Sequence, residues 1–112
     1  YLDKAQMLKE FDKAINLETD SVVRGYILSE KAEYLLKQKD YNASLNIYNS
    51  LLAAYRKGDK VSFSPEMAYY YRSLIKKATG DVSGAKLDYA IASRMCPECE
   101  YPKMRVLKVR KP

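Results

Sequence analysis

The most informative stretch of this chain is KQKDYNASLNIY, residues 37–48. It reads as the end of one helix, a tight turn and the start of a second helix, because Asp40 is a residue type that caps free helix N–H groups. Tyr41, Leu45 and Tyr48 then follow at spacings of four and three, which puts them on one helical face. The stretch therefore predicts a helical hairpin.

A weaker copy of the stretch, ATGDVSGAKLDY, occupies residues 78–89. Asp81 in this copy follows Asp40 by 41 residues, and a partial third copy places Glu10 30 residues before Asp40. Similarity at fixed intervals is typical of helical repeat arrays. The chain is therefore expected to repeat its hairpin turn.

Apolar periodicity predicts five helices, at residues 3–17, 21–38, 41–55, 65–79 and 82–96. The expected N-terminal caps are Asp20 or Ser21, Asp40, Ser64 and Asp81. Gly58 and Gly80 are the expected helix stops. The residues after Pro102 suit either a sixth helix or a short strand, and we favour the helix. The fold class is thus all-α, with five to six helices.

These residues resemble the tetratricopeptide repeat family, whose second helix opens with Gly-Asp-Tyr, a small residue and then an aromatic one. The matching residues are Asp40, Tyr41, Ser44 and Tyr48, followed by Gly80, Asp81, Ala85 and Tyr89. Ala32 and Ser73 match a small residue eight positions before each Asp, and Pro97 matches a frequent proline. The resemblance covers about residues 9–97. It implies a right-handed array of antiparallel helical hairpins.

Several positions depart from the family pattern, whose period is about 34 residues. Lys39 replaces the turn glycine, Arg56 stands where proline is expected, and Lys31 and Arg72 occupy a usually apolar position. A long loop at residues 56–63 accounts for the wider interval. We expect the small residues Ala32, Ser44, Ser73 and Ala85 to let paired helices approach closely. The rings of Tyr41, Tyr48 and Tyr89 would then fill gaps between hairpins.

The chain is expected to form a single domain over residues 1–112. Its parts would be a half repeat at 1–18, hairpins at 21–57 and 64–96, and a basic cap or the start of another repeat at 101–112. The 47% apolar content suits a folded domain, and no apolar run approaches the roughly 20 residues that span a membrane. Because it begins at Tyr1, we expect an excised domain or a processed product, so a missing targeting segment stays open.

The net charge of +6 lies almost entirely in residues 101–112, which hold five basic and no acidic side chains. A nucleic-acid-binding domain usually spreads its basic charge over a folded face as well. The chain contains no His, the commonest general base and metal ligand. With no catalytic constellation and no Gly-rich phosphate loop in the sequence, we expect neither an enzyme nor a need for a cofactor or metal.

Tyr69, Tyr70, Tyr71 and Arg72 form the sharpest candidate for a binding site. Helical side chains point about 100° apart, so Tyr71 is expected in the core stripe, which Tyr69 and Tyr70 cannot both join. The resemblance implies a peptide-holding groove lined by the first helix of each hairpin. The predicted partner-binding residues are Tyr70, Arg72, Tyr69, Lys31 and Tyr34. The alternative is that the rings only pack inside the protein.

Some members of the family clamp a C-terminal carboxylate with Lys and Asn in the groove helices. The corresponding residues here are Ser29, Glu33, Tyr70 and Leu74, which do not match. We therefore do not predict binding of chaperone tails.

The two cysteines form a Cys-x-x-Cys spacing, at Cys96 and Cys99. Cys96 continues a packed stripe, so we expect it to fill the core. A disulfide with Cys99, or a metal shared between molecules, is the alternative. Reduced cysteines and the lack of a visible signal segment favour the cytoplasm.

The leading hypothesis is a protein-interaction scaffold that binds a peptide or protein segment in its groove, with no small-molecule substrate. One alternative is a nucleic-acid-associated domain that uses the basic C-terminal residues. The other is a structural module that self-assembles into a homo-oligomer, because exposed hairpin faces can pair.

Overall fold

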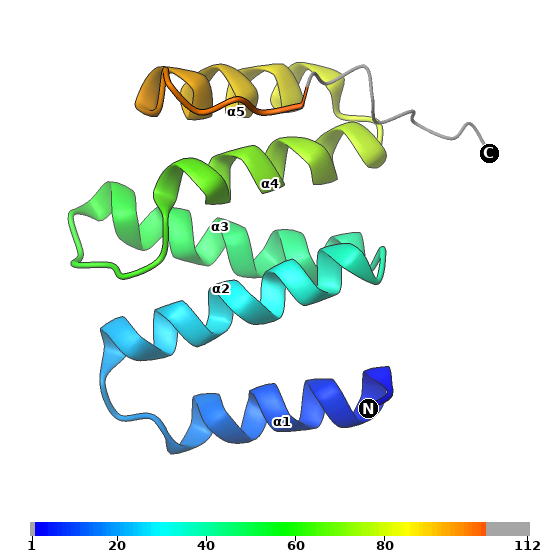
Figure 1. Cartoon of the computed structure of the whole chain (residues 1–112), viewed down its shortest axis with the longest axis vertical. Helices are drawn as coiled ribbons and strands as arrows, with labels where there is room; N and C mark the ends of the chain where they lie inside the picture. Colours follow the sequence, from blue (N-terminus) through cyan, green and yellow to red (C-terminus); the bar gives the residue numbers. More distant parts are fainter. Residues whose placement is uncertain (1, 103–112) are drawn as a thin grey trace.

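The computed structural model describes residues 2–102 and contains five helices there (Figure 1). They are α1 (Lys4–Leu17), α2 (Ser21–Lys37), α3 (Tyr41–Lys57), α4 (Pro65–Ala78) and α5 (Val82–Met95). Each helix begins and ends within two residues of its predicted bounds, which confirms the all-α prediction. The helix or strand predicted after Pro102, and with it the proposed basic cap, falls outside the described residues.

The five helices pack in order along the chain, each against the next. Consecutive helices run in opposite directions, from α1 at one end of the stack to α5 at the other (Figure 1). In addition, α2 contacts α4, although α3 separates them in the sequence. This contact brings together the two helices predicted to line a groove.

Three of the predicted caps hold their helix ends as expected. The carboxylate of Asp20 accepts hydrogen bonds from the first turn of α2, Ser64 does so for α4, and Asp81 does so for α5. Asp40 stands at the cap position of α3, but its side chain makes no capping hydrogen bond. Its carboxylate lies 3.3 Å from Lys4 Nζ instead, so an ion pair to α1 replaces the predicted cap.

Left-handed backbone conformations end two of the helices. Gly58 and Gly80 have φ of 101° and 96°, as their predicted role as helix stops requires. Lys39 adopts the same region with φ of 61°, at the turn where the repeat pattern has glycine. A side chain in this conformation costs about 1 kcal/mol, so Lys39 strains the α2–α3 turn.

Small residues bring the paired helices close together, as predicted. Ala32, Ser44, Ser73 and Ala85 are all completely buried. The Ser44 hydroxyl on α3 donates a hydrogen bond of 2.7 Å to the Ala32 carbonyl oxygen on α2. A single serine side chain therefore spans the α2–α3 contact and satisfies its own buried hydroxyl.

The core lies between α2, α3, α4 and α5. Its largest fully buried apolar side chains include Tyr48 and Leu52 on α3 and Ile75 on α4. Phe63 closes the core from the loop that precedes α4 and is itself buried. By contrast, α1 contributes no buried residue. The first helix is thus held mainly by partly exposed contacts with α2.

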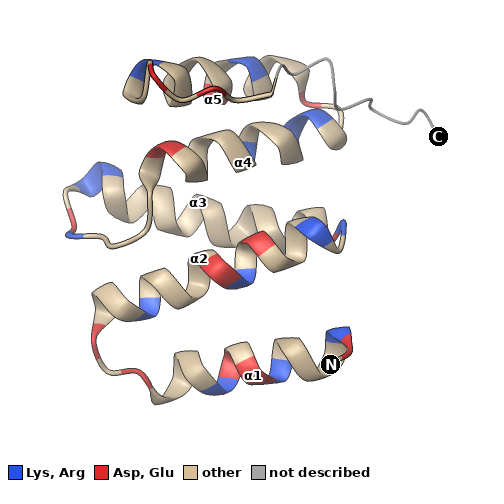
Figure 2. Ribbon diagram, in the orientation of Figure 1, with Lys and Arg blue, Asp and Glu red and all other residues tan. Residues whose placement is uncertain are grey.

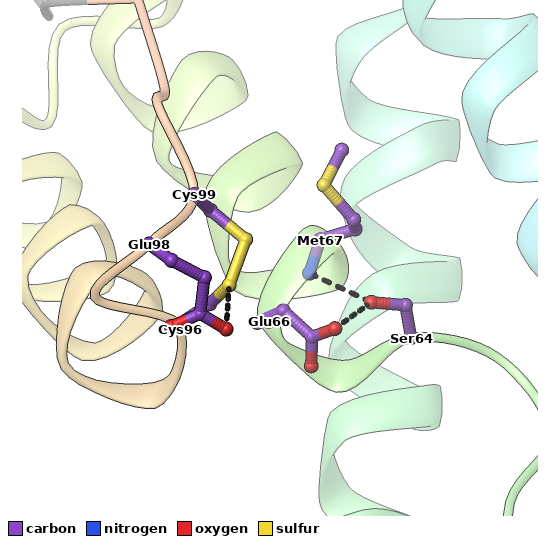
Figure 3. Close-up of a disulfide and its surroundings, with 6 residues drawn as sticks. All are labelled: Ser64, Glu66, Met67, Cys96, Glu98 and Cys99. Carbon is purple, nitrogen blue, oxygen red and sulfur yellow. Dashed lines mark hydrogen bonds between the residues drawn. A yellow bond between two sulfur atoms is a disulfide. The ribbon is translucent and has the colours of Figure 1, made fainter.

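The segment after α5 turns back across the end of the stack. Cys96 and Cys99 form a disulfide (Figure 3). The Cys99 N–H also donates a hydrogen bond to the Cys96 carbonyl oxygen. The expectation that Cys96 fills the core is therefore replaced by its alternative, the disulfide. Because both cysteines are oxidised in this disulfide, they give no support to a location in the cytoplasm.

Candidate functional site

The tyrosine run on α4 is buried differently from the prediction. Tyr69 and Tyr70 are the buried rings, 5% and 7% exposed, while Tyr71 is only partly buried. The reason is that α4 packs against both α3 and α5, which widens its buried face. Tyr70 also stacks on Tyr101, with ring centroids 4.6 Å apart. Tyr71 packs against the core as expected, but the expectation that Tyr69 and Tyr70 cannot both be buried is wrong.

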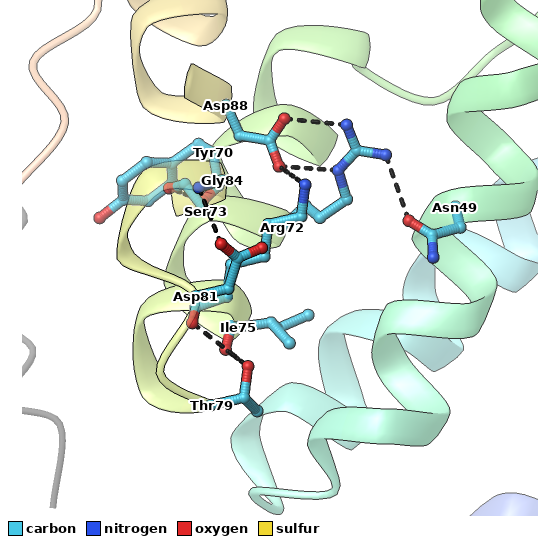
Figure 4. A network of polar contacts seen from close by, with 10 residues as sticks. Asn49, Tyr70, Arg72, Ser73, Ile75, Thr79, Asp81, Gly84 and Asp88 are labelled. Carbon is cyan, nitrogen blue, oxygen red and sulfur yellow. Dashed lines mark hydrogen bonds and ion pairs between the residues drawn. The ribbon is translucent and has the colours of Figure 1, made fainter. Parts of the chain in front are cut away.

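Arg72 takes part in a polar network that joins three helices (Figure 4). Its Nε and Nη2 each donate a 2.8 Å hydrogen bond to the carboxylate of Asp88 on α5. Its Nη1 reaches Asn49 on α3, and Lys76 Nζ lies 3.0 Å from the same carboxylate. The hydrogen bonds with Asp88 raise the pKa of the Arg72 guanidinium, although burial opposes the rise. Arg72 thus neutralises the fully buried carboxylate of Asp88.

The remaining predicted residues hold neighbouring groups in place. Lys31 Nζ lies 2.7 Å from Asp12 on α1, and Tyr34 packs against Phe11 on the same helix. Tyr69 lies under the Arg72 guanidinium, whose carbon is 5.4 Å from the ring centroid. Lys31 and Tyr34 thus join α2 to α1, whereas the contact between Tyr69 and Arg72 lies within α4.

A groove between α2 and α4 is lined by other residues. It consists of two hollows, which we call the acidic hollow and the basic hollow. The acidic hollow, about 210 Å³, is lined by residues that include Tyr26, Glu30, Glu33, Tyr48, Met67 and Tyr71. The basic hollow, about 340 Å³, is lined by residues that include Glu33, Leu36, Lys37, Lys39, Tyr71 and Leu74. Figure 2 shows acidic residues in the middle of α2 and a basic residue at its C-terminal end.

Glu33 and Tyr71 lie at the boundary between the two hollows and line both of them. The Tyr71 hydroxyl donates a 2.8 Å hydrogen bond to Glu33 Oε1, so the pair bridges α2 and α4. Burial, this hydrogen bond and the charge of Glu33 raise the pKa of Tyr71 to about 12. Tyr71 therefore stays protonated near neutral pH and keeps its role as donor.

Tyr48 lines the acidic hollow from α3 and is only 2% exposed. Its buried hydroxyl has no hydrogen-bond partner among the described residues. Burial raises the pKa of Tyr48, and Tyr71 and Glu33 add smaller contributions. Tyr48 lines the same hollow as Glu33 and Tyr71, and its ring centroid lies 6.0 Å from that of Tyr71.

A larger cavity of about 430 Å³ lies between the start of α2, the end of α3 and the loop before α4. Its lining is largely apolar and includes Val22, Leu28 and Phe63. Arg24, which also lines the cavity, donates hydrogen bonds through Nε and Nη2 to the Glu18 carbonyl oxygen. Asp59 and Lys60 add charged groups of opposite sign to the lining of this cavity.

The sequence contains a signal for the groove that our prediction did not use. Tyr26, Glu30, Glu33 and Lys37 recur at spacings of four, three and four, the spacing of one helical face. Lys31 and Tyr34, the two predicted residues on α2, lie on the neighbouring face toward α1. None of the five predicted partner-binding residues lines either hollow.

No family model, curated protein or solved structure matches this chain. Over residues 2–102, no helix is both long enough and apolar enough to cross a membrane. In the same part of the chain, no three His, Cys, Asp or Glu side chains are grouped so that they could hold a metal ion.

Proposed function

We propose that this chain is a protein-interaction module that binds a segment of another protein in the α2–α4 groove. The main support for this proposal is the groove itself, which consists of two adjoining hollows that share the Glu33–Tyr71 pair. Its rim includes Tyr26, which is 48% exposed although it is a large aromatic side chain. Exposed tyrosines beside a groove are frequent anchors in protein interfaces.

We also infer that the five helices form an α-solenoid of tetratricopeptide-like hairpins, with α1 as a half repeat. Two features support this finer description. Ser44 and Ala85 are buried at equivalent places of the two hairpins, and so are Ala32 and Ser73. The contact between α2 and α4 is the one expected between the first helices of successive hairpins.

The charge pattern of the groove suits a segment rather than a small molecule. Glu30 and Glu33 lie along one part, and Lys37 and Lys39 along the next. Lys37 follows Glu30 by seven residues, which corresponds to about 10 Å along a helix. An extended chain covers that length with about three residues, so a short peptide can reach both hollows.

The test is a selection from a display library of short random peptides, followed by measurement of Kd for the best binder. Tyr26→Ala is expected to weaken binding about tenfold, because truncating an interface anchor costs more than 1 kcal/mol. Leu87→Ala is the matched control, since Leu87 on α5 is also exposed and does not line the groove. A binder that Tyr26→Ala leaves unaffected, or a selection without binders, would contradict the proposal.

Binding of nucleic acid stays a prediction based on the basic residues of 103–112, which lie outside the described part of the chain. A shift in nucleic-acid mobility that weakens with salt would support it. Self-assembly also stays a prediction, which light scattering can test. We propose neither as the main function.

A further inference from the structure

We infer that the acidic hollow receives one basic side chain, Lys or Arg, of the bound protein segment. This inference rests on the proposed function and adds the chemistry of the partner at one place in the groove. Three observations support it: the charges that line the hollow, an unpartnered buried hydroxyl, and the rings around it.

The charges that line the hollow are of one sign. Glu30 and Glu33 both contribute to the lining, and no basic side chain does so among the described residues. Lys31 lies between them in the sequence, but it is paired with Asp12 on α1. The carboxylates are therefore not neutralised by the nearest lysine on the same helix.

Tyr48 supplies a hydrogen-bonding group for a bound cation. Its hydroxyl is buried, and no group in residues 2–102 bonds to it. Leaving such a group unsatisfied is costly, and native proteins do so rarely. An ammonium or guanidinium group carries only donors, so it would use the hydroxyl oxygen as an acceptor. The same group would lie near Glu33 and gain a charge-assisted contact.

Aromatic rings complete the hollow. Tyr26, Tyr48, Tyr71 and Phe63 all line it, and the Tyr48 and Tyr71 ring centroids are 6.0 Å apart. Ring faces attract cations, with the effect increasing as water is excluded. The volume of about 210 Å³ is below the usual range for sites of drug-sized ligands, which begins near 300 Å³. It suits a single long side chain.

The first arm of the test needs no peptide partner. The N-acetyl methylamides of arginine, lysine and norleucine are titrated separately into the isotope-labelled protein, and backbone amide shifts are recorded by NMR. We expect the arginine or lysine compound to shift Glu33 and Tyr71 amides, and norleucine to leave them in place. Glu33→Gln and Tyr48→Phe are each expected to weaken this binding about tenfold.

Control variants and a second arm separate the two proposals. Leu87→Ala should leave the titration unchanged, and Tyr48→Phe should stay folded because only a hydroxyl is removed. In the second arm, each basic residue of a peptide selected for groove binding is replaced by norleucine. Loss of affinity at one such position supports the inference.

Equal shifts from norleucine and the basic compounds would overturn the inference, as would binding that is insensitive to both Glu33→Gln and Tyr48→Phe. A selected peptide that depends on Tyr26 but tolerates norleucine at every basic position would overturn it and leave the proposed function standing. Cation binding in the first arm with no peptide selected would reject the proposed function and keep the basic side-chain site.

Discussion

Tyr48 lines the same hollow as Glu33 and Tyr71, and its buried hydroxyl makes no hydrogen bond with any described residue. Phenylalanine would fill the same space without leaving a polar atom unsatisfied. Two tyrosines at the same hollow thus differ in what their hydroxyls contribute: the Tyr71 hydroxyl links two helices, and the buried Tyr48 hydroxyl has no partner among residues 2–102. At the scale of single residues, this difference can be measured.

Tyr48→Phe is expected to leave the free energy of unfolding unchanged or raise it by up to about 1 kcal/mol, because a desolvated hydroxyl is removed. Tyr71→Phe, the matched control, is expected to lower it by about 1 kcal/mol through loss of the bond to Glu33. Urea denaturation of both variants provides the comparison. Equal destabilisation by the two substitutions would show that the Tyr48 hydroxyl is bonded in the free protein.

Lys39→Gly is expected to stabilise the protein by about 0.5–1 kcal/mol, since glycine adopts the left-handed conformation without strain. Gly80→Ala places a side chain in the same conformation at the other hairpin turn and should cost a similar amount. Thermal unfolding of the two variants tests both signs. A lower melting temperature for Lys39→Gly would mean that Lys39 makes a stabilising contact that outweighs its strain.

At the scale of helices, ion pairs of very different burial hold neighbouring elements together. Arg72 and Lys76 on α4 meet Asp88 on α5, where the carboxylate is completely buried. Lys31 on α2 meets Asp12 on α1 at a more exposed position. Removing one partner of a buried pair leaves an uncompensated charge in the interior, whereas water compensates at an exposed pair.

Arg72→Met is therefore expected to lower the free energy of unfolding by about 3 kcal/mol, since Asp88 would keep only Lys76 as its cationic partner. Lys31→Met should cost less than about 1 kcal/mol, because the Asp12 carboxylate stays hydrated. Chemical denaturation of both variants gives the two values. If they were equal, the buried Asp88 carboxylate would not depend on Arg72 for compensation of its charge.

Over the whole molecule, the order and bounds of the helices follow from local signals. Asp20, Ser64 and Asp81 cap as expected, and Gly58 and Gly80 adopt the predicted conformation. Such signals depend on residues close in sequence, so they can be recognised without knowledge of tertiary contacts. The five helices also pack in the order in which they follow one another in the chain.

By contrast, the side chains that line the groove could not be predicted from such local signals. Tyr70 is covered by Tyr101, 31 residues later, and Arg72 is matched by Asp88 on another helix. Neither partner can be assigned without the register between α4 and the chain that follows it. Periodicity marks the wide buried face of α4, but it does not say which neighbour covers each tyrosine. The predicted binding residues Tyr70 and Arg72 are therefore side chains that contact other parts of the protein.

The most direct test of groove binding is an NMR titration of the labelled protein with the tightest peptide from the display selection. We expect the largest amide shifts at residues that line the two hollows, above all Tyr26, Glu33, Tyr71 and Leu74. The exposed side of α5 around Leu87 should change least. Largest shifts on α5 or α1, with the α2–α4 groove unaffected, would contradict the account.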